Sequence, residues 1–227
     1  SDVLVSKYSE DPESHIQKSY ALTNLGSSEI DLGHYKKALT LLYESESIKK
    51  SVLAQQEKPT DEYKYEMAVT SSFICNIYAK TDRLSEASDC YLNQIGIISK
   101  LIDNNSAANE WKRQLSSLMQ FYASVELARG YPERAQIAID NSIMHLTFLN
   151  KEEPENYTWT IYLANAHRIA SDVARSRGKP NKCIEHLDIA IKNITNYKSS
   201  NTAWKKINAD YILKKKQCST RHTNTYN

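Results

Sequence analysis

The sequence predicts an all-α protein in which four helix–turn–helix repeats stack into a solenoid and one further helix follows them. Three observations support this fold class. The 227 residues include only five Gly and five Pro, so long helices can run without interruption, whereas a fold rich in β-turns needs more of both. Apolar residues recur at steps of three and four, which gives each helix one buried stripe. Two sequence markers repeat about every 48 residues, which is typical of stacked supersecondary units.

The first marker is a ring-bearing residue that follows a polar junction. Trp111 and Trp159 lie 48 residues apart, and the same step back leads to Tyr63 and then to His15. Each ring follows a run of acidic, Pro, Asn, Ser and Thr residues, such as "NNSAANEW" at 104–111. Oxygens of such side chains cap the free backbone amides at the start of a helix. The junctions therefore predict where each first helix begins, with Asn and Ser as caps for the helix that carries Trp111.

The second marker is a turn residue five places before a small residue. The pairs are Gly33 with Ala38, Asp82 with Ala87, Gly130 with Ala135, and Gly178 with Cys183. Gly ends a helix readily because it adopts the left-handed backbone conformation at no steric cost, whereas Asp82 does so less favourably. The small residue lets the two helices of a repeat approach closely. This marker therefore predicts the turn inside each repeat.

The two markers divide residues 9–217 into one predicted solenoid domain. Its repeats are expected at about 12–57, 60–104, 107–151 and 155–198. In the second repeat the apolar stripes are formed by Met67, Ile74, Cys75 and Tyr78 before the turn and by Leu84, Ala87, Tyr91, Ile95 and Ile98 after it.

A further helix is predicted at 202–217, beginning near Trp204. We expect it to cap the exposed face of the last repeat, with Lys214 to Lys216 favoured at its end by the helix dipole. The alternative is the first helix of a further repeat, truncated or used for homodimerisation. Residues 218–227 have too few apolar groups to pack, so a flexible tail is expected.

The first repeat carries a recognisable set of small, apolar and turn residues. Leu25 and Gly26 lie on its first helix, "GHY" at 33–35 forms its turn, and Ala38, Leu42 and Ser45 lie on its second helix. This pattern resembles the tetratricopeptide repeat (TPR) family. A unit of that family has about 34 residues, so a period near 48 leaves about two more turns for each helix, or about 20 residues per helix. The resemblance implies a right-handed α-solenoid whose first helices line a concave groove.

The length of the repeat also indicates the kind of protein in which such repeats occur. Repeats of this longer period, with a Trp after the junction, are similar to those appended to bacterial signalling proteins such as serine/threonine kinases and winged-helix regulators. The resemblance implies a regulatory or scaffold region of a larger signalling protein. Either a cytoplasmic protein or the periplasmic part of a membrane-anchored regulator fits it.

The function implied by the resemblance is non-catalytic protein–protein interaction, with a segment of a partner protein held in the groove. Groove candidates are Asn76, Lys80, Gln120, Arg168, Asp172 and Arg175, whose side chains offer charge-assisted hydrogen bonds. A solvated polar face is the ordinary alternative for these residues. A second interpretation is a sensor region that binds a peptide or small molecule and relays the signal to an attached effector domain. Chaperone-binding members carry a Lys and Asn clamp in the first repeat, where this chain has Thr23 and Ser27.

Other functional classes find little support in the sequence. The 29 basic and 27 acidic residues are scattered, so a nucleic-acid partner is not expected. The longest apolar runs are only a few residues, such as "IGII" at 95–98, against about 20 for a membrane span, so no membrane contact by this fragment is expected. There is no phosphate-binding, serine-hydrolase or zinc-protease motif, and the six histidines do not cluster. We therefore expect no enzyme activity, cofactor or metal.

The four cysteines are far apart in the sequence, with no C-x-x-C pair and no histidine at the spacing of zinc ligands. Cysteine is often buried as a small apolar residue. We expect Cys75, Cys90, Cys183 and Cys218 to be buried in helix packing.

Overall fold

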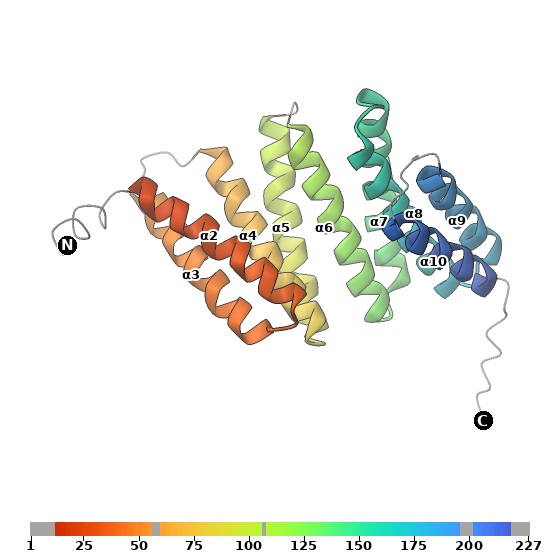
Figure 1. Cartoon of the computed structure of the whole chain (residues 1–227), viewed down its shortest axis with the longest axis horizontal. Helices are drawn as coiled ribbons and strands as arrows, with labels where there is room; N and C mark the ends of the chain where they lie inside the picture. Colours follow the sequence, from red (N-terminus) through yellow and green to blue (C-terminus); the bar gives the residue numbers. More distant parts are fainter. Residues whose placement is uncertain (1–11, 56–59, 106–107, 196–201, 219–227) are drawn as a thin grey trace. The chain divides into compact units, whose positions relative to one another are not determined.

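The computed structural model describes residues 12–55, 60–105, 108–195 and 202–218, and every regular element within them is an α-helix (Figure 1). The helices are α2 (Pro12–Asp31), α3 (Tyr35–Ala54), α4 (Asp61–Lys80), α5 (Leu84–Asn104), α6 (Asn109–Ala128), α7 (Pro132–Glu152), α8 (Tyr157–Ser176), α9 (Pro180–Thr195) and α10 (Thr202–Cys218). The predicted fold class, an all-α solenoid of helix pairs followed by a terminal helix, is confirmed. The predicted tail lies outside the described residues except for Cys218, which ends α10.

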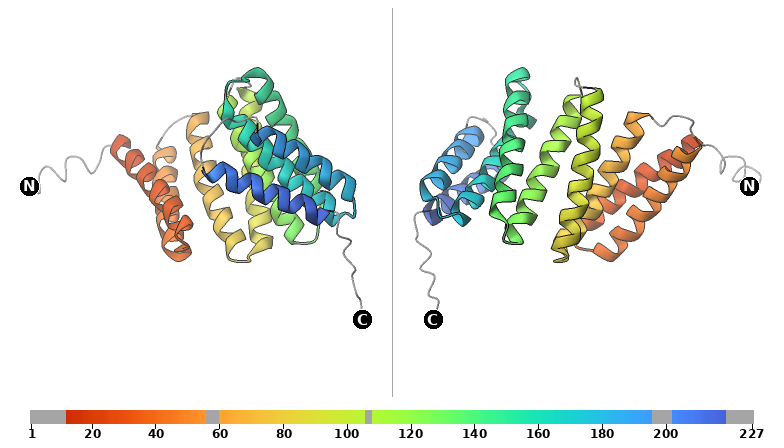
Figure 2. Two further views of the ribbon diagram at one scale, coloured as in Figure 1. Left: turned by 45° about the vertical axis from the view of Figure 1, so that its right-hand side comes forward. Right: turned by 180° about the vertical axis from the view of Figure 1, so that it is seen from behind.

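The helices form two compact units, residues 1–107 with α2 to α5 and residues 108–227 with α6 to α10. In each unit every helix packs against the next one along the chain, and the first helices of successive pairs also touch, α2 with α4 and α6 with α8 (Figure 2). Within the described residues, no helix is long and apolar enough to cross a membrane. The prediction of a single domain over 9–217 stays a prediction.

The four turns inside the helix pairs have the predicted backbone geometry. Gly33, Gly130 and Gly178 have φ angles of 78°, 83° and 66°, and Asp82 has a φ angle of 61°. The amide that follows each of them returns to the carbonyl five residues earlier, as in the Tyr131 N to Glu126 O bond of 2.8 Å. The turn marker therefore identified all four helix ends.

The junctions between repeats cap their helices only in part as predicted. Thr60 accepts a hydrogen bond from the Tyr63 amide at 3.4 Å, and Asn156 accepts one from the Thr158 amide at 3.2 Å. The prediction was wrong for α6, whose N-cap is Ala108 and whose start has no side-chain cap. The predicted cap at Asn201 lies outside the described residues.

The junction before α6 is hydrogen-bonded to the junction before α8. Asn109, the first residue of α6, donates to Glu153 Oε1 at 2.6 Å. Glu153 Oε2 also accepts from Asn156 Nδ2 at 3.0 Å and from Trp159 Nε1 at 2.9 Å. These three donors hold the pKa of Glu153 below its usual value, with the Asn156 bond the largest cause. Asn109 lies one place inside α6, after the N-cap position at Ala108, so its side chain does not cap the helix, and its amide links the two junctions instead.

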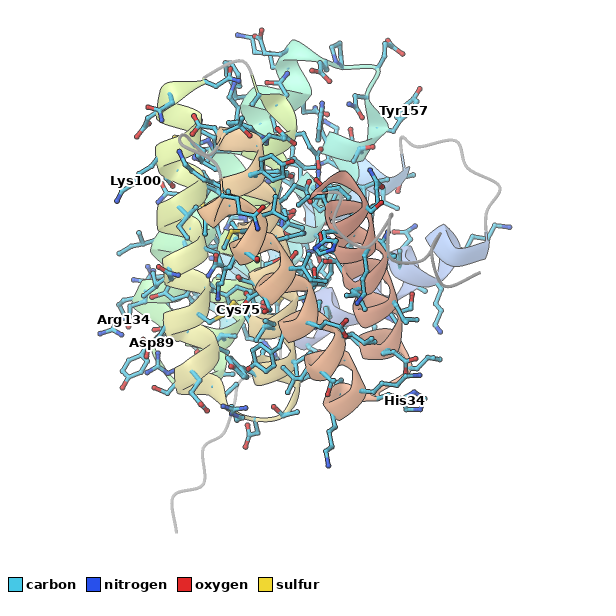
Figure 3. All side chains as sticks on the ribbon, turned by 90° about the vertical axis from the view of Figure 1, so that its left-hand side faces the viewer. His34, Cys75, Asp89, Lys100, Arg134 and Tyr157 are labelled. Carbon is cyan, nitrogen blue, oxygen red and sulfur yellow. A yellow bond between two sulfur atoms is a disulfide. The ribbon has the colours of Figure 1, made fainter. Side chains whose placement is uncertain are left out.

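All four cysteines are oxidised, which corrects the expectation that they are isolated small residues. A disulfide joins Cys75 on α4 to Cys90 on α5 (Figure 3). A second joins Cys183, in the first turn of α9, to Cys218 at the end of α10. Burial itself was predicted correctly for Cys75, Cys183 and Cys218, whereas Cys90 is half-buried. Each unit therefore contains one covalent link between neighbouring helices.

Gly26 marks the closest approach of α2 to α3, and it offers a test of the repeat packing. A Cβ atom there would lie 2.8 Å from Leu42 Cγ and 2.9 Å from Leu42 Cδ2, so a neighbour would have to move. We expect Gly26→Ala to lower the free energy of unfolding by about 1–2 kcal/mol in urea denaturation. The matched control is Gly96→Ala in α5, where the added methyl meets open space and should stabilise the helix by about 0.5–1 kcal/mol. Equal stability of the two variants would contradict the close packing.

Candidate functional site

A chain of hydrogen bonds joins α6 to α8 in the second unit. Gln120 is only 2% exposed, and its amide donates to Ser142 Oγ at 3.2 Å. Asn165 Nδ2 donates to Gln120 Oε1 at 2.6 Å, and Arg168 Nε donates in turn to Asn165 Oδ1 at 3.1 Å. A second guanidinium nitrogen of Arg168, Nη1, donates to Asp172 Oδ2 at 3.1 Å. Two directional bonds therefore fix the orientation of the Arg168 side chain before any ligand arrives.

Asp172 gathers three cations from two helices. Besides Arg168, it lies 3.7 Å from Arg175 Nη2 on α8 and 3.4 Å from Lys214 Nζ on α10. The side chains of Arg168, Asp172 and Lys214 are 25%, 20% and 27% exposed, so this cluster is partly shielded from water. One carboxylate among three cations leaves a positive charge on this part of the surface.

An apolar slot opens beside this cluster between α8, α9 and α10. Its volume is about 510 Å³, within the range of roughly 300–1,000 Å³ that is usual for ligand sites. Its walls are formed by the apolar side chains of Ile161, Ile194, Ile207 and Tyr211 and by the polar side chains of Asn165, Arg168, Lys206 and Asp210. Tyr211 is 5% exposed, and burial raises the pKa of its hydroxyl. We call the surface made of this slot and the ionic cluster around Asp172 the first-helix face of the second unit, because α8 contributes to both.

The structure brings four of the six groove candidates together. Arg168, Asp172 and Arg175 form one ionic cluster, and Gln120 joins it through Asn165 as a buried internal partner. The other two candidates, Asn76 and Lys80, lie on α4 in the first unit, half-buried and exposed respectively.

The sequence pattern missed the slot because two of its three walls come from helices other than the first helices of the repeats. Ile194 lies on α9, and Ile207 and Tyr211 lie on α10. The spacing of Ile207 and Tyr211 did indicate an apolar stripe on the terminal helix. What it did not indicate is that the stripe leaves part of the α8 and α9 surface uncovered.

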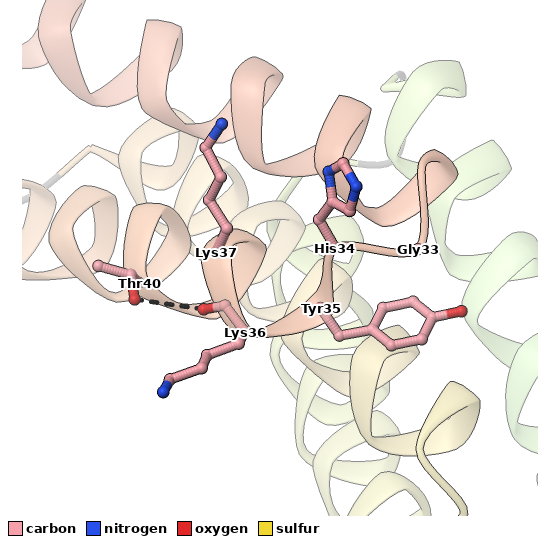
Figure 4. A pocket seen from close by; sticks show the side chains of 6 residues that line it. All are labelled: Gly33, His34, Tyr35, Lys36, Lys37 and Thr40. Atoms are coloured by element: carbon pink, nitrogen blue, oxygen red, sulfur yellow. Dashed lines mark hydrogen bonds between the residues drawn. The ribbon is translucent and has the colours of Figure 1, made fainter.

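A wider hollow lies at the turn between α2 and α3, with a volume of about 640 Å³ (Figure 4). It is lined by Gly33, His34, Tyr35, Lys36, Lys37 and Thr40. Two of its basic groups already have an internal partner, because His34 Nδ1 and Lys37 Nζ each lie 2.7 Å from the Glu29 carboxylate. These contacts hold the pKa of Glu29 low, with the Lys37 bond the largest cause. These two basic groups therefore stabilise the turn between α2 and α3, and they leave little charge free to bind a ligand.

Lys49 is the most deeply buried cation among the described residues, with 1% exposure. It takes the place in the repeat that Ile98, Leu146 and Ile194 have in the others. Its Nζ donates to Thr70 Oγ1 at 2.7 Å and to the Glu66 carbonyl at 3.3 Å, and it lies 4.9 Å from the centre of the Tyr20 ring. Burial lowers the pKa of Lys49. The ammonium is satisfied within the first unit, so its role there is structural.

Two histidines meet between α8 and α9. The Nδ1 atoms of His167 and His186 are 3.1 Å apart, so one imidazole donates to the other. Burial lowers the pKa of His167 to about 4 and also lowers that of His186. Among the described residues, no group of three or more His, Cys, Asp or Glu side chains is arranged to hold a metal ion. The pair is therefore a shared hydrogen bond between neutral rings.

Comparison with known proteins supports the fold and gives no function. No protein-family model matches the sequence, and no curated protein matches it significantly. Among solved structures, BtubC (BKLC) from P. vanneervenii superposes with a TM-score of 0.64 at 14% sequence identity, over 92% of this chain and 80% of that chain. At this identity the likeness supports a helical-repeat fold and nothing about function.

Two further matches have low scores. The de novo designed helical repeat protein DHR64 gives a TM-score of 0.33 at 14% identity, over 92% of this chain and 96% of that chain. The DHF119 filament gives 0.34 at 12% identity, over 91% and 96%. TM-scores this low say nothing further about the fold or the function of this chain.

Proposed function

We propose that the chain is a TPR-like, non-catalytic interaction module, the regulatory or scaffold region of a larger signalling protein. It binds a segment of a partner protein on the first-helix face of the second unit. The observation that carries this proposal is the apolar slot next to an arginine whose orientation is already fixed. Large apolar anchors in a pocket and charged groups held in place are the features that dominate protein–protein binding energy.

The slot suggests how a partner segment is recognised. An apolar side chain of the partner enters between Ile161 and Ile207 and is removed from water. Backbone carbonyls or carboxylates of the same segment meet Arg168 and Lys206 at the edge of the slot. The excess of cations around Asp172 favours a partner that carries acidic residues near its apolar anchor.

A pull-down with a matched pair of variants tests this proposal. We expect Ile161→Asp, which places a charge in the slot, to reduce recovery of the partner from a lysate of the source organism by about tenfold or more. The control is Ile137→Asp on α7, where the side chain is 65% exposed and lies outside the slot. It should recover the partner as the wild type does.

The charged part of the site has its own variant. The double substitution Arg168→Ala and Arg175→Ala removes two of the three cations around Asp172 and should also weaken recovery. Circular dichroism melting of each variant checks that the helices are intact. Unchanged recovery with both the Ile161 and the double arginine variants would remove the site from this face.

A further inference from the structure

Gln94 departs from the pattern of its own repeat. Seven residues after the small residue of each turn marker stand Ser45, Gln94, Ser142 and Ala190. Ser45 and Ser142 donate to carbonyls on the first helix of their repeat, to Ser19 O at 2.8 Å and to Ser116 O at 3.0 Å. Gln94 is 4% exposed, no hydrogen bond to a described residue holds its amide, and that amide is not among the side-chain atoms closed off from solvent without a partner. The Gln94 amide is therefore open to a hydrogen bond with a molecule from outside the chain.

The Gln94 side chain lines a pocket between α3, α4 and α5 in the first unit. The pocket has a volume of about 380 Å³, at the small end of the roughly 300–1,000 Å³ range for small-molecule sites. Met67, Ala68 and Ile97 form its apolar part. The remaining lining residues are Glu46, Lys50, Lys64, Ser71 and Asn93.

The charged groups of the pocket lie on two of its walls. Glu46 on α3 is 14% exposed, accepts a hydrogen bond from Ser71 and lies 3.3 Å from Lys50 Nζ. Lys64 on α4 pairs with Asp61 at 2.7 Å. Both lysines are well exposed, at 62% and 46%, and exposed ion pairs contribute little, so a ligand carboxylate competes for them readily.

We propose that this pocket binds a short peptide, two or three residues long, with an apolar side chain and free termini. The peptide group pairs with the Gln94 amide, which supplies both a donor and an acceptor. The terminal ammonium faces Glu46, and the terminal carboxylate faces the two lysines. The apolar side chain covers Met67 and Ile97.

Other ligand classes fit the lining less well. A purely apolar molecule would leave the Gln94 amide unpaired. A phosphate or a simple organic anion would face the Glu46 carboxylate without a cation of its own to offer. A cation without an apolar part would leave Met67 and Ile97 in water. A short peptide carries a positive and a negative terminus with an amide between them, so its groups match the charged, amide and apolar walls of the pocket.

Isothermal titration calorimetry with the dipeptide L-alanyl-L-leucine tests the proposal. We expect binding to the wild type and a weakening of about five- to tenfold in Gln94→Ser, which installs the residue that two other repeats carry. Lys64→Ala is a second variant, on the exposed wall, that leaves the core untouched. The matched control is Asn141→Ser, an exposed amide on α7, which should bind as the wild type does.

Ligand analogues test the assignment of the two termini. N-acetyl-L-alanyl-L-leucine lacks the ammonium and should bind at least about fivefold more weakly. Absence of binding to the wild type up to about 10 mM dipeptide, tenfold above the Kd of a weak 1 mM complex, would overturn the proposal. Equal binding by the wild type, Gln94→Ser and Lys64→Ala would overturn it as well. Either failure leaves the proposed function intact, because the slot lies in the other unit.

Discussion

Replacing Cys183 and Cys218 by serine is expected to lower the free energy of unfolding of the second unit by about 4 kcal/mol. The disulfide closes a loop with a sequence separation of 35, and cross-linking a loop of that length removes much of the conformational freedom of the unfolded chain. It also fastens the end of α10, which packs mainly on α9 and has no following helix among the described residues. Urea denaturation of the oxidised wild type and the double serine variant measures the effect.

The other disulfide supplies the control. Cys75→Ser with Cys90→Ser opens a loop with a separation of 15 and should cost about 3 kcal/mol in the first unit. Hydrogen exchange separates the two effects, because only the Cys183 and Cys218 variant should lose amide protection in α10. A serine variant as stable as the oxidised wild type would show that the link adds nothing. Since disulfides persist in oxidising compartments, we expect the chain to reach its full stability only in such an environment.

The backbone of the repeats was predictable because local chemistry decides it. Gly33, Gly130 and Gly178 end helices for a reason that lies within a few residues, and the small residues of the turn marker need only one partner helix. The disulfide between Cys75 and Cys90 was missed, although a signal for it was present. The two cysteines lie seven residues before and eight residues after Asp82, so a helix hairpin that turns at Asp82 brings them face to face.

The sites were harder to predict because they depend on contacts between repeats. The position of Gln120 in its repeat predicts that it lines the groove. In the structure it is buried and accepts a hydrogen bond from Asn165 of the next repeat. The slot forms only where α10 packs in one particular position against α8 and α9. The 48-residue repeat does not predict that position. Lys49 and Gln94 are departures that an alignment of the four repeats reveals, since each replaces residues of another kind at its register. Whether such a departure is satisfied internally, as for Lys49, or left open, as for Gln94, is decided by the packing.

Lowering the pH from 7 to 4.5 is expected to destabilise the second unit through His167. Burial lowers the pKa of this imidazole to about 4 in the folded protein, with the neighbouring His186 adding to the effect and Glu185 opposing it. In the unfolded chain it takes up a proton near pH 6.5. The unfolded state therefore binds more protons between these two values, and stability falls as the pH falls. A difference of about 2.5 pKa units corresponds to a loss of about 3 kcal/mol once the pH reaches the folded pKa.

The histidine pair has charged neighbours on α7 and α9. His186 faces Glu185 and Asp140, which favour its protonation, and Lys182, which opposes it. Carboxylates with lowered pKa values, such as Glu153, lose their contribution only below the ordinary carboxyl pKa. Within the second unit, the groups with shifted pKa values that titrate between pH 6.5 and 4.5 are therefore histidines, namely His145, His167 and His186.

The variant His167→Gln retains a side chain that can donate to or accept from His186 but removes the titrating group. Urea denaturation at steps of pH should give a flatter decline in the variant than in the wild type, by most of the expected 3 kcal/mol, or about 2 kcal/mol by pH 4.5. His34→Gln, at an exposed site in the first unit, leaves the pair in place and should keep the decline of the second unit. Because the comparison is between variants at the same pH, other titrating groups cancel. An identical decline in the wild type and His167→Gln would mean that the buried pair does not hold His167 neutral.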